Sequence, residues 1–367
     1  MKVPMLDLHA QYEALMPAIR AQLDRVFQDH HYIMGAQVKE LETRMQEYLG
    51  IKHAIGCASG TDALVLAVKA LGITDGDEVI TTPFTFFATA SSIWRNHAKP
   101  VFVDIDEDTF NLDPAKIEAA ITEKTKAIMP VHLFGQCCDM EAIMKIAQKH
   151  NLKVIEDNAQ GIGSTWNGKM SCSFGDIGTL SFFPSKNLGA MGDAGMCLTN
   201  DDQLAAGLRQ LRVHGENPKY YHQWVGLNSR LDTLQAAVLL VKLEALAGWS
   251  EARRANAAFY DSELKGIPGL KTPHIPQQAV SIYNQYTLTT EKRDALMAHL
   301  QKKDIGCAIY YPLPLHLQEC FAELGYKKGD LPVAERMANQ VLSIPIYPEL
   351  TVEMKQYVVA SIREFFN

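Results

Sequence analysis

One lysine interrupts an apolar stretch of the sequence, and its residue type suits covalent chemistry. Lys186 stands in "SFFPSKNLGAMGDAGM", between an aromatic-rich run and a loop of Gly and Ala. Lysine is rarely buried without a partner. In such surroundings its pKa is lowered, and its amine can form a Schiff base with an aldehyde. The alternative is a solvent-facing lysine, which is the default for any single Lys.

A second candidate precedes this lysine at the end of an apolar run. Asp157 closes "VIED", and a partly desolvated carboxylate at a strand end needs a cationic partner. Taken alone, such an Asp is more often a helix N-cap or a surface acid. Paired with Lys186, it matches the two anchors of pyridoxal 5'-phosphate (PLP): an Asp at the pyridinium nitrogen and a Lys bonded to the aldehyde. The pair therefore predicts this cofactor.

Other residues can hold the phosphate and the ring of such a cofactor. "CASGTDAL" reads as a strand end followed by a helix start, where free N–H groups and the helix dipole favour an anion. Thr61 adds a hydroxyl there, Gly60 permits close approach, and Ser181 can donate another hydrogen bond. Similar turns cap many helices, so this signal is weak by itself. Among the three phenylalanines of "PFTFFATA", we expect two in the core and Phe86 stacked on the ring.

Composition narrows the classes of function. The chain has 367 residues, 47% of them hydrophobic, with a formal net charge of -7 and a pI near 6.0. It has no long Lys/Arg cluster and no apolar run of roughly 18 residues, so we expect neither nucleic-acid binding nor a membrane span. The N-terminal stretch lacks the apolar core of a signal peptide, which predicts a cytoplasmic protein.

Cysteine and histidine usage argues for free thiols and no metal. The cysteines lack a CxxC pair and number seven: Cys57, Cys137, Cys138, Cys172, Cys197, Cys307 and Cys320. An odd count in a long chain fits free thiols in a reducing compartment. The adjacent Cys137 and Cys138 suggest either redox chemistry or, as we expect, buried structural thiols. The twelve histidines are scattered without HExxH, so no metal site is predicted.

Short apolar runs, each followed by a helix-like segment, must position these residues. Runs at residues 53–60, 77–83, 99–106, 125–135 and 152–161 alternate with helical patterns, which predicts a mostly parallel sheet covered by helices. Ligands of such sheets bind beyond the C-terminal strand ends, here Ser59–Asp62, Pro83–Phe87, His132–Gly135 and Asp157–Gly161. A long helical pattern follows Arg230. We place a domain boundary near residue 250, giving a large domain of 1–250 and a small one of 251–367.

The ordered set of motifs resembles a known family. SGTDAL, PFTFFAT, VIEDNAQ, SFFPSKNLGAMGDAG, GLNSRLDTLQAA and YYPLPLH occur in this order across nearly the whole chain. This pattern is similar to the DegT-type nucleotide-sugar aminotransferases. The resemblance implies the α/β PLP-dependent transferase fold type I, like aspartate aminotransferase. Its large domain has a mostly parallel seven-stranded sheet, and a smaller C-terminal α/β domain follows.

The resemblance also implies roles for individual residues. Lys186 matches the Schiff-base lysine, Asp157 the partner of the ring nitrogen, and Gln160 the residue beside the ring hydroxyl. Gly60, Thr61 and Ser181 match the phosphate site, and Phe86 the stacking aromatic. Asn228 matches a phosphate ligand that the neighbouring subunit supplies, which implies a homodimer with shared active sites. Arg230, Tyr311 and His316 match residues near the sugar nucleotide or the donor carboxylate.

The implied reaction moves an amino group from L-glutamate, leaving 2-oxoglutarate, to a nucleotide-linked keto-sugar. "NSRLDTLQAA" resembles members that aminate C3 of a UDP-linked 3-keto-N-acetylglucosaminuronic acid in lipopolysaccharide or O-antigen synthesis. This chain has Tyr310-Tyr311-Pro312 where those enzymes tend to have His-Tyr-Pro. The alternatives are a dTDP-linked 3-keto-6-deoxyhexose or a 4-keto nucleotide sugar.

Three other classes of protein stay open at this point. A non-catalytic PLP-binding regulator of the same fold has no need for Lys186. A sugar dehydratase of this fold has His in place of the lysine. A nicotinamide-dependent oxidoreductase requires GxGxxG, and the glycine spacing of "GIGSTWNG" does not match it. Arg212, His214 and Lys219 either offset the diphosphate charge of the substrate or lie on a solvent-exposed face.

Overall fold

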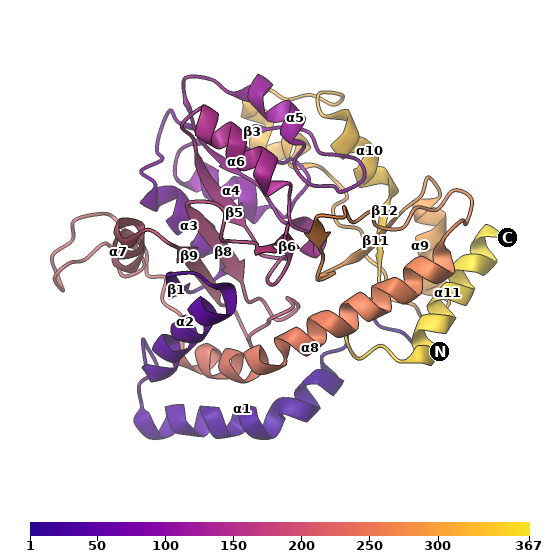
Figure 1. The fold of residues 1–367 in the computed structure, drawn as a ribbon, viewed down its shortest axis with the longest axis horizontal. Helices are drawn as coiled ribbons and strands as arrows, with labels where there is room; N and C mark the ends of the chain where they lie inside the picture. Colours follow the sequence, from indigo (N-terminus) through magenta and orange to yellow (C-terminus); the bar gives the residue numbers. More distant parts are fainter.

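A seven-stranded sheet forms the centre of the molecule (Figure 1). The computed structural model describes residues 1–367. In spatial order, the strands are β1 (His53–Cys57), β9 (Gly195–Thr199), β8 (Ile177–Ser181), β5 (Lys153–Asp157), β4 (Thr125–Met129), β2 (Glu78–Thr81) and β3 (Lys99–Phe102). Only β9 runs antiparallel to its neighbours. The predicted mostly parallel seven-stranded sheet is therefore confirmed.

Both faces of this sheet are covered by helices, because consecutive strand residues point to opposite sides. Ala127 and Ile155 pack with the helices on one face, whereas Ile128 and Val154 pack on the other. The helices that precede α8 in the sequence are α1 (His9–Asp29), α2 (Ala36–Leu49), α3 (Gly60–Ala70), α4 (Ala88–Arg95), α5 (Pro114–Ile117), α6 (Met140–Lys149) and α7 (Asp202–Leu211). α2 packs on the face opposite to α3 and α4.

Most of the remaining elements lie after the sheet in the sequence, and β6 and β7 lie between β5 and β8. The longest helix, α8 (Thr233–Leu264), runs below the sheet with α1 alongside it (Figure 1). A second apolar core collects residues from α8 and from the C-terminal part of the chain. Its elements are β11 (Tyr286–Thr289), α9 (Arg293–Lys302), β12 (Val341–Ile344) and α11 (Val352–Phe366). α10 (Pro332–Gln340) packs instead in a cluster with Phe84 and Val131 at the strand ends of the large sheet. A small sheet joins β6 (Thr165–Trp166), β7 (Lys169–Met170) and β10 (Ala279–Val280).

Two features bear on the predicted division at residue 250. α8 is continuous through that position, so no linker separates the two parts of the chain. Val3 is fully buried in the C-terminal core, where its N–H donates to the carbonyl of Asp304 at 2.9 Å. The N-terminal segment around Val3 therefore packs with the second core. The two-domain boundary at residue 250 stays a prediction.

The predicted strand ends do lie at one edge of the sheet. Ser59–Asp62 follow β1, Pro83–Phe87 follow β2, His132–Gly135 follow β4 and Asp157–Gly161 begin at the end of β5. β4 and β5 are adjacent and parallel, so their C-terminal ends carry neighbouring loops. No helix has the length and apolar character that crossing a bilayer requires.

Candidate active site

Lys186 lies in the loop between β8 and β9, and buried apolar neighbours fix that loop. Phe182 donates its N–H to the carbonyl of Ala194 at 2.8 Å, and Ala190 donates to the carbonyl of Phe182 at 2.7 Å. Phe182, Leu188 and Ala190 are buried in the core between β8 and α8. The loop is thus anchored on both sides of the lysine.

The amine of Lys186 has an unusual protonation equilibrium. Burial lowers its pKa from 10.5 to about 8, while the nearby Asp157 carboxylate opposes this shift. Lys186 as a whole residue is only partly buried. A lysine of this pKa has a larger neutral fraction near pH 7 than an exposed lysine has, and the neutral amine is the nucleophilic form.

Asp157 is buried at the end of β5, and only neutral donors of the chain bind it. Its Oδ2 accepts a hydrogen bond from Thr89 Oγ1 at 2.7 Å, and its Oδ1 accepts one from the Ala159 N–H at 3.2 Å. Burial raises the pKa of this carboxyl, although both hydrogen bonds and Lys186 lower it. A cationic ligand at this carboxylate would offset the cost of burying its charge.

The turn before α3 has the geometry of an anion cradle. Ser59 is the N-cap, and its side chain accepts from the Asp62 N–H at 3.1 Å. A Cβ at Gly60 would lie 2.5 Å from the Cβ of Ser181, and one at Gly195 would lie 2.3 Å from the Ser59 carbonyl. The structure therefore brings Gly60, Thr61 and Ser181 together at a helix N-terminus, where an anion is favoured.

The three phenylalanines after β2 differ in their surroundings. Phe84 is fully buried, and Phe87 stacks on Phe321 with ring centroids 5.5 Å apart. Phe86 is 57% exposed, and its ring lies 6.4 Å from that of Tyr311. Of the three, Phe86 offers the most open ring face.

Gln160 connects the end of β5 to Tyr311. Its Oε1 accepts from the Phe134 N–H at 2.7 Å, and its Nε2 donates to the Tyr311 hydroxyl at 3.1 Å. Burial raises the pKa of Tyr311, so this hydroxyl stays protonated near neutral pH. Both bonds fix the Gln160 amide beside Asp157.

Asn228, Arg230 and His316 are not brought into this group of side chains. Asn228 is exposed, Arg230 is partly buried, and neither makes a side-chain hydrogen bond to the residues above. The ring of His316 is buried, with its Nε2 3.0 Å from a Glu335 carboxylate oxygen. The roles of these three residues stay predictions.

One residue near Asp157 was not singled out from the sequence. Thr89 is buried on α4. Its hydroxyl donates the shorter of the two hydrogen bonds that the Asp157 carboxylate accepts. Nothing in the type or spacing of a threonine in "FATASS" marks it for this role. Only the packing of α4 against the sheet reveals it.

The sequence agrees over most of its length with one family model. Residues 14–363 match the DegT/DnrJ/EryC1/StrS aminotransferase family. The chain belongs to this family. The predicted family and enzyme class are therefore confirmed, and a nicotinamide-dependent oxidoreductase is not supported.

Several relatives of this DegT-family chain match it from end to end. A Geobacillus stearothermophilus protein named "Pleiotropic regulatory protein" is 55% identical, with 100% of this chain and 99% of the relative covered. The UDP-2-acetamido-2-deoxy-3-oxo-D-glucuronate aminotransferase of Pseudomonas aeruginosa is 45% identical over 98% of this chain and 99% of its own. The UDP-N-acetyl-3-dehydro-alpha-D-glucosamine 3-aminotransferase of Acidithiobacillus ferrooxidans is 46% identical over 98% and 97%.

Solved structures confirm the fold and the cofactor. DesV of S. venezuelae, solved in complex with a ketimine intermediate, has a TM-score of 0.98 and 40% identity over 100% of this chain and 99% of its own. NtdA of Bacillus subtilis, solved with bound cofactor PMP, has a TM-score of 0.93 and 32% identity over 100% and 85%. PLP, with its amino form PMP, is the cofactor of this DegT family. The buried Asp157 carboxylate, the Gly60 cradle and the Lys186 amine fit this group.

Proposed function

We propose that this chain moves an amino group from L-glutamate to the C3 keto group of a UDP-linked keto-sugar. The products are 2-oxoglutarate and the amino sugar. The observation that carries the proposal is the Lys186 amine, with its pKa lowered to about 8, beside the buried Asp157. This arrangement occurs in a chain 45–46% identical to two enzymes named as 3-aminotransferases of UDP-linked sugars.

The residues around these two would hold PLP. Lys186 provides the covalent link, and Asp157 pairs with the ring nitrogen and keeps it protonated. Gly60, Thr61 and Ser181 bind the phosphate, supported by their placement at the start of α3. Gln160 would bind the ring hydroxyl and Phe86 would cover a ring face. The bound cofactor supplies an electron sink for the carbon that loses its proton.

The proton transfer falls to the Lys186 amine. With PLP bound, the neutral amine of Lys186 would take the proton from the carbon of the donor amino acid and would later return it as the general acid. The same amine would perform both proton transfers in the opposite order for the keto-sugar. A pKa near 8 suits both directions, because the amine can be deprotonated and reprotonated near neutral pH.

The substrate contacts come from the outer parts of the site. We place Arg230, Tyr311 and His316 near the sugar nucleotide or the donor carboxylate, as the family resemblance implies. The contact of Tyr311 with Gln160 and Phe86 supports its part of this assignment. We assign the product to lipopolysaccharide or other surface-glycan synthesis in the cytoplasm.

The active enzyme is a homodimer in this proposal, with Asn228 reaching the phosphate of the partner's cofactor. The loop after α7 projects from the body of the molecule (Figure 1) and carries the apolar side chains Tyr220, Tyr221, Trp224 and Val225 in exposed positions. Phe183 and Met191, on either side of the lysine, are also exposed. Exposed apolar side chains on this loop and beside Lys186 support the burial of these surfaces against a second subunit.

The test is a panel of 3-keto and 4-keto nucleotide sugars incubated with the PLP-loaded enzyme and L-glutamate. Mass spectrometry and NMR of the product identify the aminated carbon. Amination at C3 of a UDP-linked sugar is the expected result. Amination only at C4 would overturn the positional assignment. Exclusive use of a dTDP-linked 3-keto-6-deoxyhexose would overturn the assignment of UDP. The substrate would then resemble that of the 40% identical dTDP-sugar transaminase.

A regulatory role is the second candidate, because the 55% identical relative is named as a regulatory protein. The two candidates differ in the half-reaction with glutamate alone. An aminotransferase converts its bound cofactor to the amino form and releases 2-oxoglutarate, whereas a pure binder does neither. We expect the conversion, and a cofactor spectrum unchanged by glutamate would support the regulator.

A further inference from the structure

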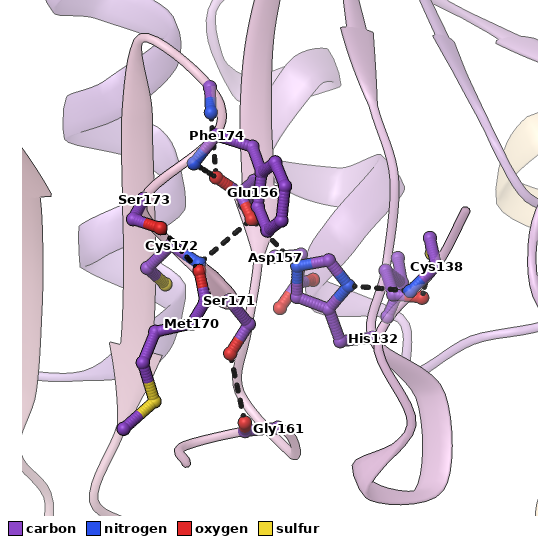
Figure 2. A network of polar contacts seen from close by, with 12 residues as sticks. His132, Cys138, Glu156, Asp157, Gly161, Met170, Ser171, Cys172, Ser173 and Phe174 are labelled. Atoms are coloured by element: carbon purple, nitrogen blue, oxygen red, sulfur yellow. Dashed lines mark hydrogen bonds and ion pairs between the residues drawn. The ribbon is translucent and has the colours of Figure 1, made fainter. Parts of the chain in front are cut away.

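The carboxylate of Glu156 belongs to a buried network that the proposed chemistry does not use (Figure 2). Its Oε1 accepts hydrogen bonds from the N–H groups of Phe174 and Gly175 at 2.8 and 2.7 Å. Its Oε2 accepts from the Cys172 N–H at 2.8 Å and lies 2.9 Å from Nε2 of His132. Four partners fill the acceptor capacity of one carboxylate, so its charge is well satisfied in the core.

The contacts of His132 define which of its ring nitrogens carries hydrogen. The ring is fully buried, and its Nδ1 accepts from the Cys138 N–H at 3.1 Å. A nitrogen that accepts from a backbone N–H is unprotonated, so the ring hydrogen resides on Nε2. Figure 2 shows the contact between this nitrogen and the Glu156 carboxylate. The imidazole therefore connects the loop after β4 to the carboxylate on β5 as a donor.

The segment that contains His132 also forms hydrogen bonds with the backbone of Asp157, the residue after Glu156. Its N–H donates to the carbonyl of Pro130 at 2.9 Å, and its carbonyl accepts from the His132 N–H at 3.0 Å. Glu156 and Asp157 are consecutive in a strand, so their side chains leave opposite faces of the sheet. The network on the Glu156 face thus restrains the residue whose carboxylate faces the cofactor side.

The turn that carries Gln160 is packed against this network as well. A Cβ at Gly161 would lie 2.9 Å from the Cβ of His132 and 2.1 Å from the Asn158 side-chain oxygen. Ser171, next to the Glu156-bound loop, donates its hydroxyl to the Gly161 carbonyl at 3.0 Å. Movement of His132 would therefore disturb the turn on which Gln160 is mounted.

We propose that His132 and Glu156 are positioning residues that hold Asp157 and Gln160 toward the cofactor ring. The inference rests on the proposed roles of those two residues in PLP binding. Neither His132 nor Glu156 needs to contact the cofactor, because each acts through the strand end and the turn. Their removal should loosen the pairing of Asp157 with the ring nitrogen while the fold persists.

Two substitutions of similar size separate the donor function from simple filling of space. His132→Asn keeps an acceptor for the Cys138 N–H but is too short to donate to Glu156. His132→Gln places an amide N–H near the position of Nε2 and should restore the donation. His53→Asn is the control, since it also removes a histidine–carboxylate contact, of 2.6 Å to Asp202, but at the far end of β1.

The readouts are the dissociation constant for PLP and the pH midpoint of the absorbance of the cofactor linked to Lys186. A weaker Asp157 pairing lowers the positive charge on the ring, so the linking nitrogen keeps its proton to a higher pH. For His132→Asn we expect PLP binding weaker by about tenfold and a midpoint higher by about half a unit. Asp157→Asn should shift the midpoint in the same direction and by more, whereas His132→Gln and His53→Asn should stay near wild type.

The double variant His132→Asn/Asp157→Asn completes the test. If His132 acts through Asp157, its substitution adds little to the shift already caused by Asp157→Asn. Full additivity, or a His132→Asn protein with lower thermal stability but an unchanged midpoint, would refute the positioning role. An unchanged midpoint in Asp157→Asn itself would instead refute the proposed function of Asp157, and the inference with it. Should His132→Asn not fold, Glu156→Asp, whose shorter side chain withdraws the carboxylate from His132, serves in its place with the same expected shifts.

Discussion

Two lysines of this chain have a pKa lowered to about 8 by burial, and only one of them lies at the proposed site. The amine of Lys242 is fully buried on α8, 4.6 Å from the ring centroid of Tyr12. Lys242 has a nearby carboxylate too, that of Glu349, whereas Lys186 lies in a loop at the strand ends near Asp157. A lowered pKa with a nearby acid therefore does not define the catalytic lysine, and its position among the other proposed cofactor-binding residues does.

The covalent link to PLP distinguishes the two lysines directly. Treatment of the yellow holoenzyme with borohydride should fix the cofactor on the peptide that contains Lys186. In Lys186→Ala, this label should disappear and turnover should fall by at least about a thousandfold. Lys242→Met is the matched control and should keep the label. Peptide mass spectrometry reads the result, and a labelled Lys186→Ala protein would contradict the assignment.

The lowered pKa of Lys186 has a cost in stability for the cofactor-free protein. Its pKa falls from 10.5 in the unfolded chain to about 8 in the folded one. Below pH 8 both states bind the proton, so the folded state carries the full penalty. Between pH 8 and 10.5 the unfolded state binds more protons, and the penalty disappears as the pH rises.

Lys186→Met should therefore stabilise the cofactor-free protein at pH 7, by about 2 kcal/mol. The gain should shrink as the pH rises from 8 toward 10, because the wild-type lysine is then neutral in the folded state. Thermal unfolding of both proteins at several pH values measures the difference. A stabilisation that stays constant across this range would mean that apolar packing, and not the amine, causes it.

At the scale of single elements, the start of α3 shows how closely the phosphate turn is packed. Gly60 faces the side chain of Ser181 at the end of β8, with no room for a methyl group between them. Because of this close approach, the turn after β1 and the end of β8 can contact the same ligand, although β9 lies between the two strands. The glycine is needed for space and not for an unusual backbone angle.

Gly60→Ala should consequently weaken PLP binding by about tenfold or more, because either the turn or Ser181 must shift. Gly248→Ala is the control, since Gly248 lies inside α8 with no atom within 4 Å of the added methyl group. That change should leave PLP binding intact and raise the stability by roughly 0.5–1 kcal/mol. Titration of the apoprotein with PLP measures both. Equal affinities for the two variants would argue against a phosphate site at this turn.

The elements around the site were largely predictable, and the reasons are physical. β1, β2, β4 and β5 are short apolar runs followed by helical periodicity, and their C-terminal ends carry the expected residues. The two-residue strands β6, β7 and β10 were not predicted, since such short pairings leave no periodic signal. Thr89 escaped notice because its role depends on how α4 packs against β5, which no local pattern encodes.

At the scale of the whole molecule, the proposed sharing of sites between subunits gives a sharp prediction. Lys186→Ala and Asn228→Ala are each expected to be nearly inactive as homodimers. In a mixed dimer, one site would carry both defects and the other would carry none. Random mixing should thus recover about a quarter of the wild-type activity.

Activity of the refolded or co-expressed mixture, compared with each variant alone, measures this recovery. If Asn228 served the site of its own subunit, every site in the mixed dimer would carry one defect and no activity would return. A chain that is monomeric by light scattering at working concentration would exclude the arrangement altogether. The sequence predicted Asn228 only through family resemblance, because contacts between subunits leave no trace in one chain's periodicity.

The position of Val3 has a consequence for synthesis. Its N–H bonds to Asp304, and its own carbonyl accepts from the Gly306 N–H at 2.7 Å. A ribosome makes some three hundred residues between these partners, so the segment around Val3 must wait without them until residues 304–306 have been made. A nascent chain halted before residue 304 would therefore leave Val3 open to proteases.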